Sequence, residues 1–407
     1  MRPYPPSEVT SRSEAEVDPR EAGLTKSQVE AMWASVLRLY EAKMHPAIAL
    51  CVRRRGKVVI DRALGHLRGN APGAPPAAPR VLVRHDSLFN LYSGSKAVTA
   101  MLVHLCDERG LVRMDDPVCE YIPGFERHGK GDITLRQLLT HRAGLPALPG
   151  ASLDLAILSD WDAIIGMLVD ARPLSVPGRR LAYHAMTSGF ILGEVIQRVT
   201  RTPLRAFLRR ELLDPLGFTS FDYGVSPERI SDVAENAYTG LPPLPLASWM
   251  LERSIGVPIR EAVRISNLPE FLTGVIPSGN IIGTANEGSR FFELLLRGGE
   301  LDGVRIFDRR TVRRAIAETS YLEMDGVLGM PVRYGSGFML GRDSFSLFGP
   351  KTPQAYGHLG FTNVIAYAEP ERDISVCLMT SGKPFITPGQ LYWLSVTRAI
   401  ARECPRE

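Results

Sequence analysis

The sequence predicts a mixed α/β (α+β) fold in which the N- and C-terminal segments form one antiparallel sheet flanked by helices, with a mostly helical lobe between them. Apolar, strand-like runs gather near the two ends of the chain, at 47–64 and 361–380, whereas helical periodicity dominates the middle. Segments of these two kinds bury their apolar faces when helices pack against a sheet. No repeat or linker divides the chain, so we expect a single domain over 23–407, with a mixed α/β lobe from about 23–90 and 300–407.

The N-terminal elements follow from local signals. Residues 1–22 are polar, contain proline and lack periodicity, which predicts a flexible arm. Thr25 and Gln28 have the spacing of a capping box, and apolar residues at helical spacing continue to Tyr40. The runs AIALCV (47–52) and KVVIDRAL (57–64) flank an Arg-Arg-Arg-Gly turn and predict a β-hairpin.

The remaining elements follow from periodicity and turn residues. Helices are predicted over 93–109, 134–141, 160–170, 186–200, 203–213, 286–297, 309–318 and 388–403. Two late strands, 361–368 and 373–380, bracket Glu-Pro-Glu-Arg, which predicts a second hairpin.

Composition excludes several classes of protein. The chain has 407 residues, 44% of them hydrophobic and 23% charged, as in globular proteins, and its net charge of +4 does not favour a nucleic-acid partner. No apolar run approaches the roughly 18 residues that cross a membrane, and the first residues lack the apolar core of a signal peptide. We therefore expect a cytoplasmic protein without stable membrane insertion. The five cysteines lack metal-ligand spacing, so neither a metal nor another cofactor is expected.

The segment SLFNLYSGSKAVTAMLVHLCDERG (87–110) carries the strongest chemical signal. Ser93 and Lys96 are three residues apart at the start of a predicted helix, so their side chains share one face. A serine hydroxyl needs a base to become a nucleophile, and a lysine held among apolar neighbours can serve once its pKa is lowered. The chain has only 7 Lys beside 41 Arg, so a lysine here is notable. The alternative is a helix-capping serine beside a solvated lysine, and Ser95 is a second candidate cap and nucleophile.

This segment resembles the active-site helix of the serine β-lactamase-like superfamily, which includes class C β-lactamases, D-Ala-D-Ala carboxypeptidases and the family VIII carboxylesterases. Three further stretches resemble the family in the same order: LRQLLTHRAGLP (135–146), PGRRLAYHAMTSGFILGEVIQRVT (177–200) and YGHLGFTNVIAYAEPERDISVCLMTSG (356–382). The resemblance covers most of residues 25–400. It implies the β-lactamase/transpeptidase-like fold and acyl-transfer chemistry.

The resemblance assigns roles residue by residue. Ser93 matches the family's nucleophile, Lys96 its companion base, and Tyr183 the tyrosine that shares the base role and protonates the leaving group. His358 and Gly360 occupy the third motif, where β-lactamases have Lys-Thr-Gly. The resemblance implies that the N–H groups of Ser93 and Phe361 form an oxyanion hole, and that His358 binds Tyr183 or the acyl group.

Two departures from the family pattern point to the substrate. The second motif reads Tyr183-His184-Ala185, where β-lactamases have Tyr-x-Asn, so the side chain that binds an amide is missing. His358 replaces the lysine that meets a substrate carboxylate. Both changes favour a small-molecule ester, so we expect a serine carboxylesterase, a lipolytic hydrolase for small to medium acyl chains. His184 and the apolar segment 241–252 are open candidates for lining the cleft, and His141 is expected to close a turn.

Three alternatives remain. These are a β-lactam or D-alanyl-peptide hydrolase, an acyltransferase of the same fold, and a catalytically inactive binding protein. The intact Ser93, Lys96 and Tyr183 argue against the last of these.

Overall fold

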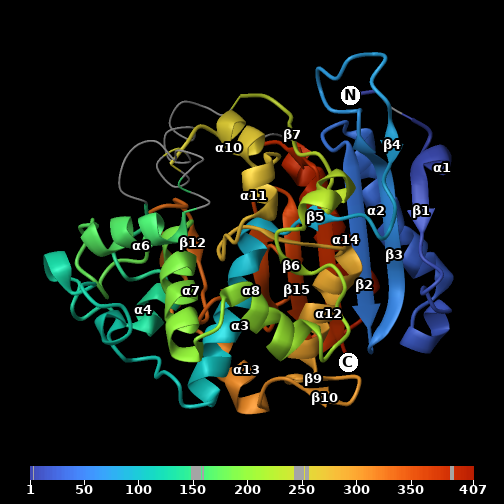
Figure 1. Cartoon of the computed structure of the whole chain (residues 1–407). Coiled ribbons are helices and arrows are strands. Elements are labelled where there is room, and N and C mark those ends of the chain that lie inside the picture. The colour runs from blue at the N-terminus through green and yellow to red at the C-terminus, as the bar shows by residue number, and fades with distance from the viewer. Residues whose placement is uncertain (3, 148–156, 158–159, 243–251, 253–255, 386–388) are drawn as a thin grey trace.

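The computed structural model describes residues 1–2, 4–147, 157, 160–242, 252, 256–385 and 389–407, and it confirms the predicted fold class. An eight-stranded antiparallel sheet has the order β1-β3-β2-β16-β15-β14-β13, with β4 paired to β3. Strands from the two ends of the chain meet where β2 pairs with β16, for example Val52 with Val376 (Figure 1). The N- and C-terminal segments therefore share one sheet, as the sequence predicts.

The strands of this sheet are β1 (Thr10–Arg12), β2 (Ala47–Arg54), β3 (Lys57–Arg68), β4 (Val81–Leu82), β13 (Met339–Leu340), β14 (Tyr356–Gly360), β15 (Val364–Glu369) and β16 (Ile374–Thr380). Both predicted hairpins are present, as β2–β3 and β15–β16. Arg55 and Gly56 connect β2 to β3 with positive φ angles of 51° and 75°, which suits a tight hairpin turn. β14 was not predicted as a separate strand.

Helices cover both faces of the sheet. Alternate residues of β2 enter two different cores: Ile48 and Leu50 pack with α2 (Lys26–Glu41) and α14 (Gly389–Glu403), whereas Ala49 and Cys51 face α12 (Ala285–Leu296). This alternation is the two-residue period of a strand. α2 begins with the predicted capping box between Thr25 and Gln28.

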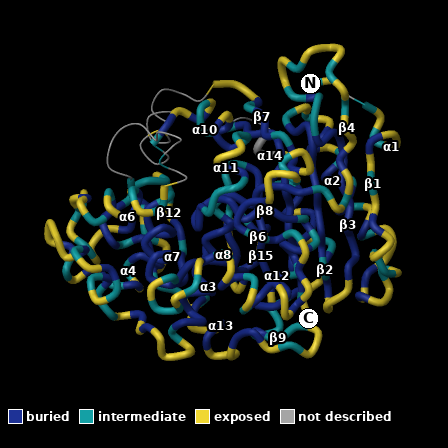
Figure 2. Tube along the Cα trace, in the orientation of Figure 1, coloured by how far each residue is buried: buried dark blue, intermediate teal, exposed yellow. Residues whose placement is uncertain are grey.

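The helical lobe lies beside the sheet (Figure 1). It contains α3 (Ser95–Glu108), α4 (Leu135–Leu139), α6 (Trp161–Asp170), α7 (Thr187–Thr200), α8 (Leu204–Leu208), α10 (Ile259–Ile265), α11 (Pro269–Thr273) and α13 (Arg309–Ala315). α3 is buried from Ser95 to Cys106 and forms the centre of this lobe (Figure 2). The short helices α10 and α11 were not predicted, and the helix predicted over 203–213 continues after α8 as one π-helical turn, 209–213.

The sequence predicts a flexible arm over 1–22, but residues 6–22 are part of the ordered fold. These residues form α1 (Pro6–Val9), β1 at the sheet edge, and a 3-10 turn over Pro19–Ala22. Glu16, with a side chain only 1% exposed, binds Arg62 of β3 at 2.8 Å. Backbone pairing and a buried ion pair hold this segment to the sheet, and neither leaves an apolar pattern in the sequence. No helix among the described residues has the length and apolar character that a membrane span requires.

Candidate active site

Ser93 and Lys96 lie where a 3-10 turn (η2, Tyr92–Gly94) passes into α3. Lys96 Nζ is 3.4 Å from Ser93 Oγ, so the two side chains share one face as predicted. Ser93 is half-buried and Lys96 is buried. Ser95 points elsewhere: its hydroxyl donates to the Tyr92 carbonyl at 2.5 Å and accepts from the Ile281 N–H at 2.9 Å. Ser95 thus anchors the turn and does not face Lys96.

The surroundings of Lys96 favour a neutral amine. Burial lowers the pKa of Lys96 from 10.5 to about 7. Its Nζ donates to the backbone carbonyls of Ala185 at 2.7 Å and Ser278 at 3.1 Å. A neutral amine has two N–H groups and one lone pair, and the two carbonyls take both N–H groups. The lone pair is then left for Ser93 Oγ, so Lys96 can accept the serine proton.

Tyr183 approaches the same two groups from the loop before α7. Lys96 Nζ lies 4.9 Å from the centre of its ring, and the side chain of Ser93 is close enough to lower the pKa of Tyr183 against the larger, opposite effect of burial. Burial, and to a lesser extent the negative charge of Asp325, raises the pKa of Tyr183 above its usual value of 10. The structure therefore brings Ser93, Lys96 and Tyr183 together, with a protonated phenol beside an amine that is partly neutral at pH 7.

The third-motif residues lie at the end of β14, against the η2 turn. Gly360 is in contact with this turn, because a Cβ at this position would be 2.6 Å from the Leu91 carbonyl oxygen. Phe361 follows it, with its ring centre 5.5 Å from that of Tyr92. This places Phe361 beside Ser93 in one cavity wall.

His358 is a buried, neutral side chain. Burial and the nearby Lys96 lower its pKa to about 3. Its Nδ1 lies 2.8 Å from the Leu359 carbonyl oxygen, which can only accept, so Nδ1 carries the proton and Nε2 remains an acceptor. The His358 and Tyr183 ring centres are 6.2 Å apart. A neutral His358 brings no positive charge to meet a substrate carboxylate.

His141 and His184 hold the backbone around Tyr183. The His184 N–H donates to His141 Nδ1 at 3.2 Å, and His184 Nε2 accepts from the Leu145 N–H at 3.1 Å. The His141 ring packs 4.7 Å from that of Tyr183, centre to centre. Both histidines are buried, so they join the turn at 141–145 to the second motif.

Three contributors to this site carried no sequence signal. Ala185 and Ser278 act through their carbonyl oxygens, which any residue type supplies. Asp325 is fully buried and accepts from the N–H groups of Tyr183, Val327 and Leu328 at 3.1, 2.8 and 2.9 Å. It fixes the backbone of Tyr183 from a segment 142 residues away.

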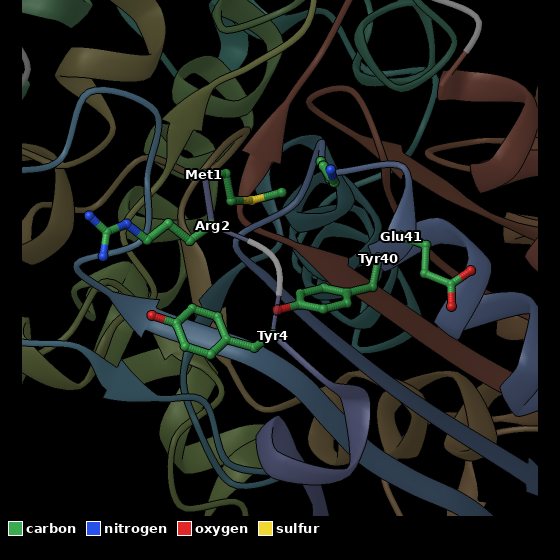
Figure 3. A pocket seen from close by; sticks show the side chains of 6 residues that line it. Met1, Arg2, Tyr4, Tyr40 and Glu41 are labelled. Atoms are coloured by element: carbon green, nitrogen blue, oxygen red, sulfur yellow. The ribbon is translucent and has the colours of Figure 1, made fainter. Parts of the chain in front are cut away.

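A cavity of about 100 Å³ opens beside Ser93. Its walls come from the η2 turn, residues 185–186, the segment 257–271 that contains α10 and α11, residues 278–279 and Phe361. The apolar segment 241–252 is a candidate cleft wall, but its residues 243–251 lie outside the described part of the chain. A separate cavity of about 270 Å³, between Tyr4 and Tyr40 near the N-terminus, contains none of the predicted site residues (Figure 3).

The described residues contain no group of three or more His, Cys, Asp or Glu side chains that could hold a metal ion. The buried side chains of Lys96 and Tyr183 beside the Ser93 hydroxyl are suited to nucleophilic acyl transfer.

Comparisons with known proteins find relatives of similar sequence and fold. The family model described as Beta-lactamase matches residues 36–398. The esterase/beta-lactamase LipL of Mycobacterium tuberculosis is 29% identical over 349 residues, which cover 81% of this chain and 76% of LipL. A penicillin-binding protein homologue from Caulobacter crescentus superposes with a TM-score of 0.78 at 27% identity, covering 94% of this chain and 99% of the other. A family VIII carboxylesterase superposes with a TM-score of 0.78 at 24% identity, over 92% and 98% of the two chains.

Proposed function

This chain belongs to the beta-lactamase family, and from that premise we propose that it is a serine carboxylesterase that cleaves esters with small to medium acyl chains through an acyl-enzyme on Ser93. The broader statement, a hydrolase of the beta-lactamase fold, rests on the family match and on the relatives. The observation that carries the finer proposal is the 3.4 Å approach of Ser93 Oγ to the buried amine of Lys96.

The first chemical step is attack by Ser93. Lys96 Nζ accepts the hydroxyl proton, and Ser93 Oγ forms a bond to the ester carbonyl carbon as the C=O π pair moves to oxygen. The N–H groups of Ser93 and Phe361 stabilise this oxyanion. Fixed donors of this kind act without reorganisation in a site that excludes water.

The second step breaks the ester bond. Tyr183 gives its phenol proton to the leaving alcohol oxygen and takes the proton that Lys96 holds, so the pair returns to its starting charge. Water then attacks the acyl-enzyme, loses its proton to the same pair, and Ser93 Oγ leaves with a proton restored. Every step uses groups of this chain alone.

Two features support an ester over an anionic amide. Ala185 has no side-chain amide to bind a peptide or β-lactam amide, and His358 is neutral. The relative LipL carries both activities in its name, so hydrolysis of β-lactams is the second candidate. Parallel kcat/KM values for p-nitrophenyl butyrate, nitrocefin and D-alanyl-D-alanine separate the two. Faster turnover of nitrocefin than of the butyrate ester would contradict the ester proposal.

The nucleophile is tested by labelling. Intact-mass spectrometry with a fluorophosphonate, followed by peptide mapping, is expected to find the adduct on Ser93 and to find none in Ser93→Ala. Ser231→Ala is the matched control, because it removes an exposed hydroxyl that does not line the cavity beside Ser93. Labelling that persists in Ser93→Ala, or full ester turnover by that variant, would refute the proposal, as would a wild-type acyl-enzyme that releases no product.

Adding a short alcohol to the same assay tests the remaining alternative. A hydrolase releases the free acid, whereas an acyltransferase passes the acyl group to the alcohol and forms a new ester. Predominant formation of the new ester at low alcohol concentration would assign the chain to acyl transfer.

A further inference from the structure

The cavity beside Ser93 is apolar and carries no charge among the described residues that line it. Val257, Ile265 and Phe271 form much of its wall, and its volume is about 100 Å³. If Ser93 forms the acyl-enzyme, as the proposed function states, this is the space next to the acyl carbon. An uncharged chain can enter it, whereas a carboxylate would be buried there without a partner.

Tyr92, the residue before Ser93, lines this cavity in a strained conformation. Its φ angle is 50°, a left-handed value that is unfavourable for a tyrosine. Strain of this kind persists only where the surroundings hold it. Here the Tyr92 N–H donates to Asn90 Oδ1 at 2.7 Å, and its hydroxyl donates to Ser266 Oγ at 3.0 Å. Ser266 in turn donates to the Val263 carbonyl at 2.8 Å, which ties the tyrosine to the end of α10.

The Tyr92 ring, which lines the cavity, also lies against a second buried amine. Lys383 Nζ lies 4.6 Å from the centre of the ring, yet Lys383 is not among the residues that line the cavity. Its amine donates to the Thr380 carbonyl at 2.6 Å and has no part in the proposed mechanism. The ring thus contacts both an apolar space and a potential positive charge.

We propose that Tyr92 is the specificity-determining residue of the acyl pocket: its ring, fixed by Ser266, closes the pocket on the side of Lys383 and restricts substrates to esters of short, uncharged acyl chains. This inference rests on the proposed function and adds the acyl class. It also gives a reason for a tyrosine at a backbone position that favours glycine.

Wild-type protein provides the first test. With p-nitrophenyl esters, kcat/KM for butyrate is expected to exceed that for octanoate by at least tenfold, and the p-nitrophenyl monoester of succinate is expected to be at least tenfold slower than the butyrate. Equal rates for butyrate and octanoate, or for butyrate and succinate, would overturn the inference even if no variant folds. A wild type that hydrolyses none of these esters would instead refute the proposed function.

Tyr92→Gly provides the second test, because glycine adopts the positive φ without strain and removes the ring. The ratio of kcat/KM for octanoate to that for butyrate should rise at least tenfold, since each newly buried methylene contributes about fourfold. Rates are normalised to active sites titrated with fluorophosphonate, and Tyr92→Ala is measured in the same way. Tyr92→Phe keeps the ring and removes only its hydrogen bond to Ser266, so its ratio should rise by much less than that of Tyr92→Gly.

The same variants test the role of Lys383. Opening the pocket toward this amine should raise succinate turnover relative to butyrate at least tenfold in Tyr92→Gly, and the gain should disappear in the double variant with Lys383→Met. An unchanged chain-length ratio in both Tyr92→Gly and Tyr92→Ala, with active wild type, would overturn the inference and leave the proposed function intact.

Discussion

The pH dependence of ester hydrolysis tests the central claim about Lys96. Burial lowers its pKa to about 7, so about half of the amine is neutral at pH 7, compared with about 0.04% for an ordinary lysine of pKa ~10.4. The gain in the reactive form is therefore roughly 10³-fold. We expect kcat/KM for p-nitrophenyl butyrate to rise about tenfold per pH unit below pH 7 and to level off above it, with a single apparent pKa near 7.

Two substitutions separate the base from a merely positive charge. Lys96→Arg keeps the charge but cannot lose its proton, and Lys96→Met removes the base, so both should lose at least about 10³-fold in kcat/KM. Lys383→Met is the matched control, because burial lowers the pKa of Lys383 to about 7 as well but its amine faces the Tyr92 ring and not Ser93. This control should retain the inflection near pH 7.

Stability provides an independent measurement of the same pKa. The folded-state pKa of Lys96 is depressed, so the unfolded state binds more protons between pH 7 and about 10.4, and stability rises with pH through this window. Integration from pH 6.5 to 8.5 gives about 2 kcal/mol for one such lysine. We expect this increase in the difference between the free energies of unfolding of wild type and Lys96→Met, measured in urea. A difference that does not change with pH, together with an activity profile that stays flat through pH 7, would refute the assignment of Lys96 as a neutral base.

Two further predictions concern the fold around the site. In Gly360→Ala the new Cβ would lie 2.6 Å from the Leu91 carbonyl oxygen and 2.8 Å from Val364 Cβ. We therefore expect kcat to fall at least about tenfold and the protein to be destabilised by about 1–3 kcal/mol. A normal kcat would show that catalysis does not need the contact between β14 and the η2 turn. Glu16→Gln weakens the buried pair with Arg62 and should cost about 3 kcal/mol by urea unfolding. The matched control Glu30→Gln, at a side chain 48% exposed, should cost less than about 1 kcal/mol; equal effects would contradict the anchoring of residues 6–22.

The parts of the fold that could be predicted are those with local physical causes. The capping box at Thr25 and the apolar periodicity after it define α2 without reference to the rest of the chain. The two hairpins have turn residues between alternating runs. In contrast, β1 pairs through its backbone at the sheet edge, and its anchor is the contact of Glu16 with Arg62, 46 residues away. A polar segment held by such distant contacts has the same composition as a free arm.

The candidate site shows the same division. Ser93 and Lys96 are three residues apart on one helix turn, so their meeting follows from helix geometry. The role of Tyr183 was reached through the order of motifs, and its position beside Ser93 depends on the buried carboxylate of Asp325. The pocket wall from α10 and α11 was missed because these helices have only seven and five residues, too few for a periodic pattern to emerge.

The family resemblance gives Lys96 and Tyr183 a shared role as base, but burial shifts their pKa values in opposite directions. The same burial disfavours the charged form of each group, so the amine loses its proton and the phenol keeps its own. Two backbone carbonyls accept hydrogen bonds from this amine, which lies 3.4 Å from Ser93 Oγ. We propose accordingly that Lys96 takes the serine proton and that Tyr183 delivers one to the leaving oxygen. This direction of proton flow depends on Ala185 and Ser278 through their carbonyl positions, which is why Ser-x-x-Lys alone does not establish it.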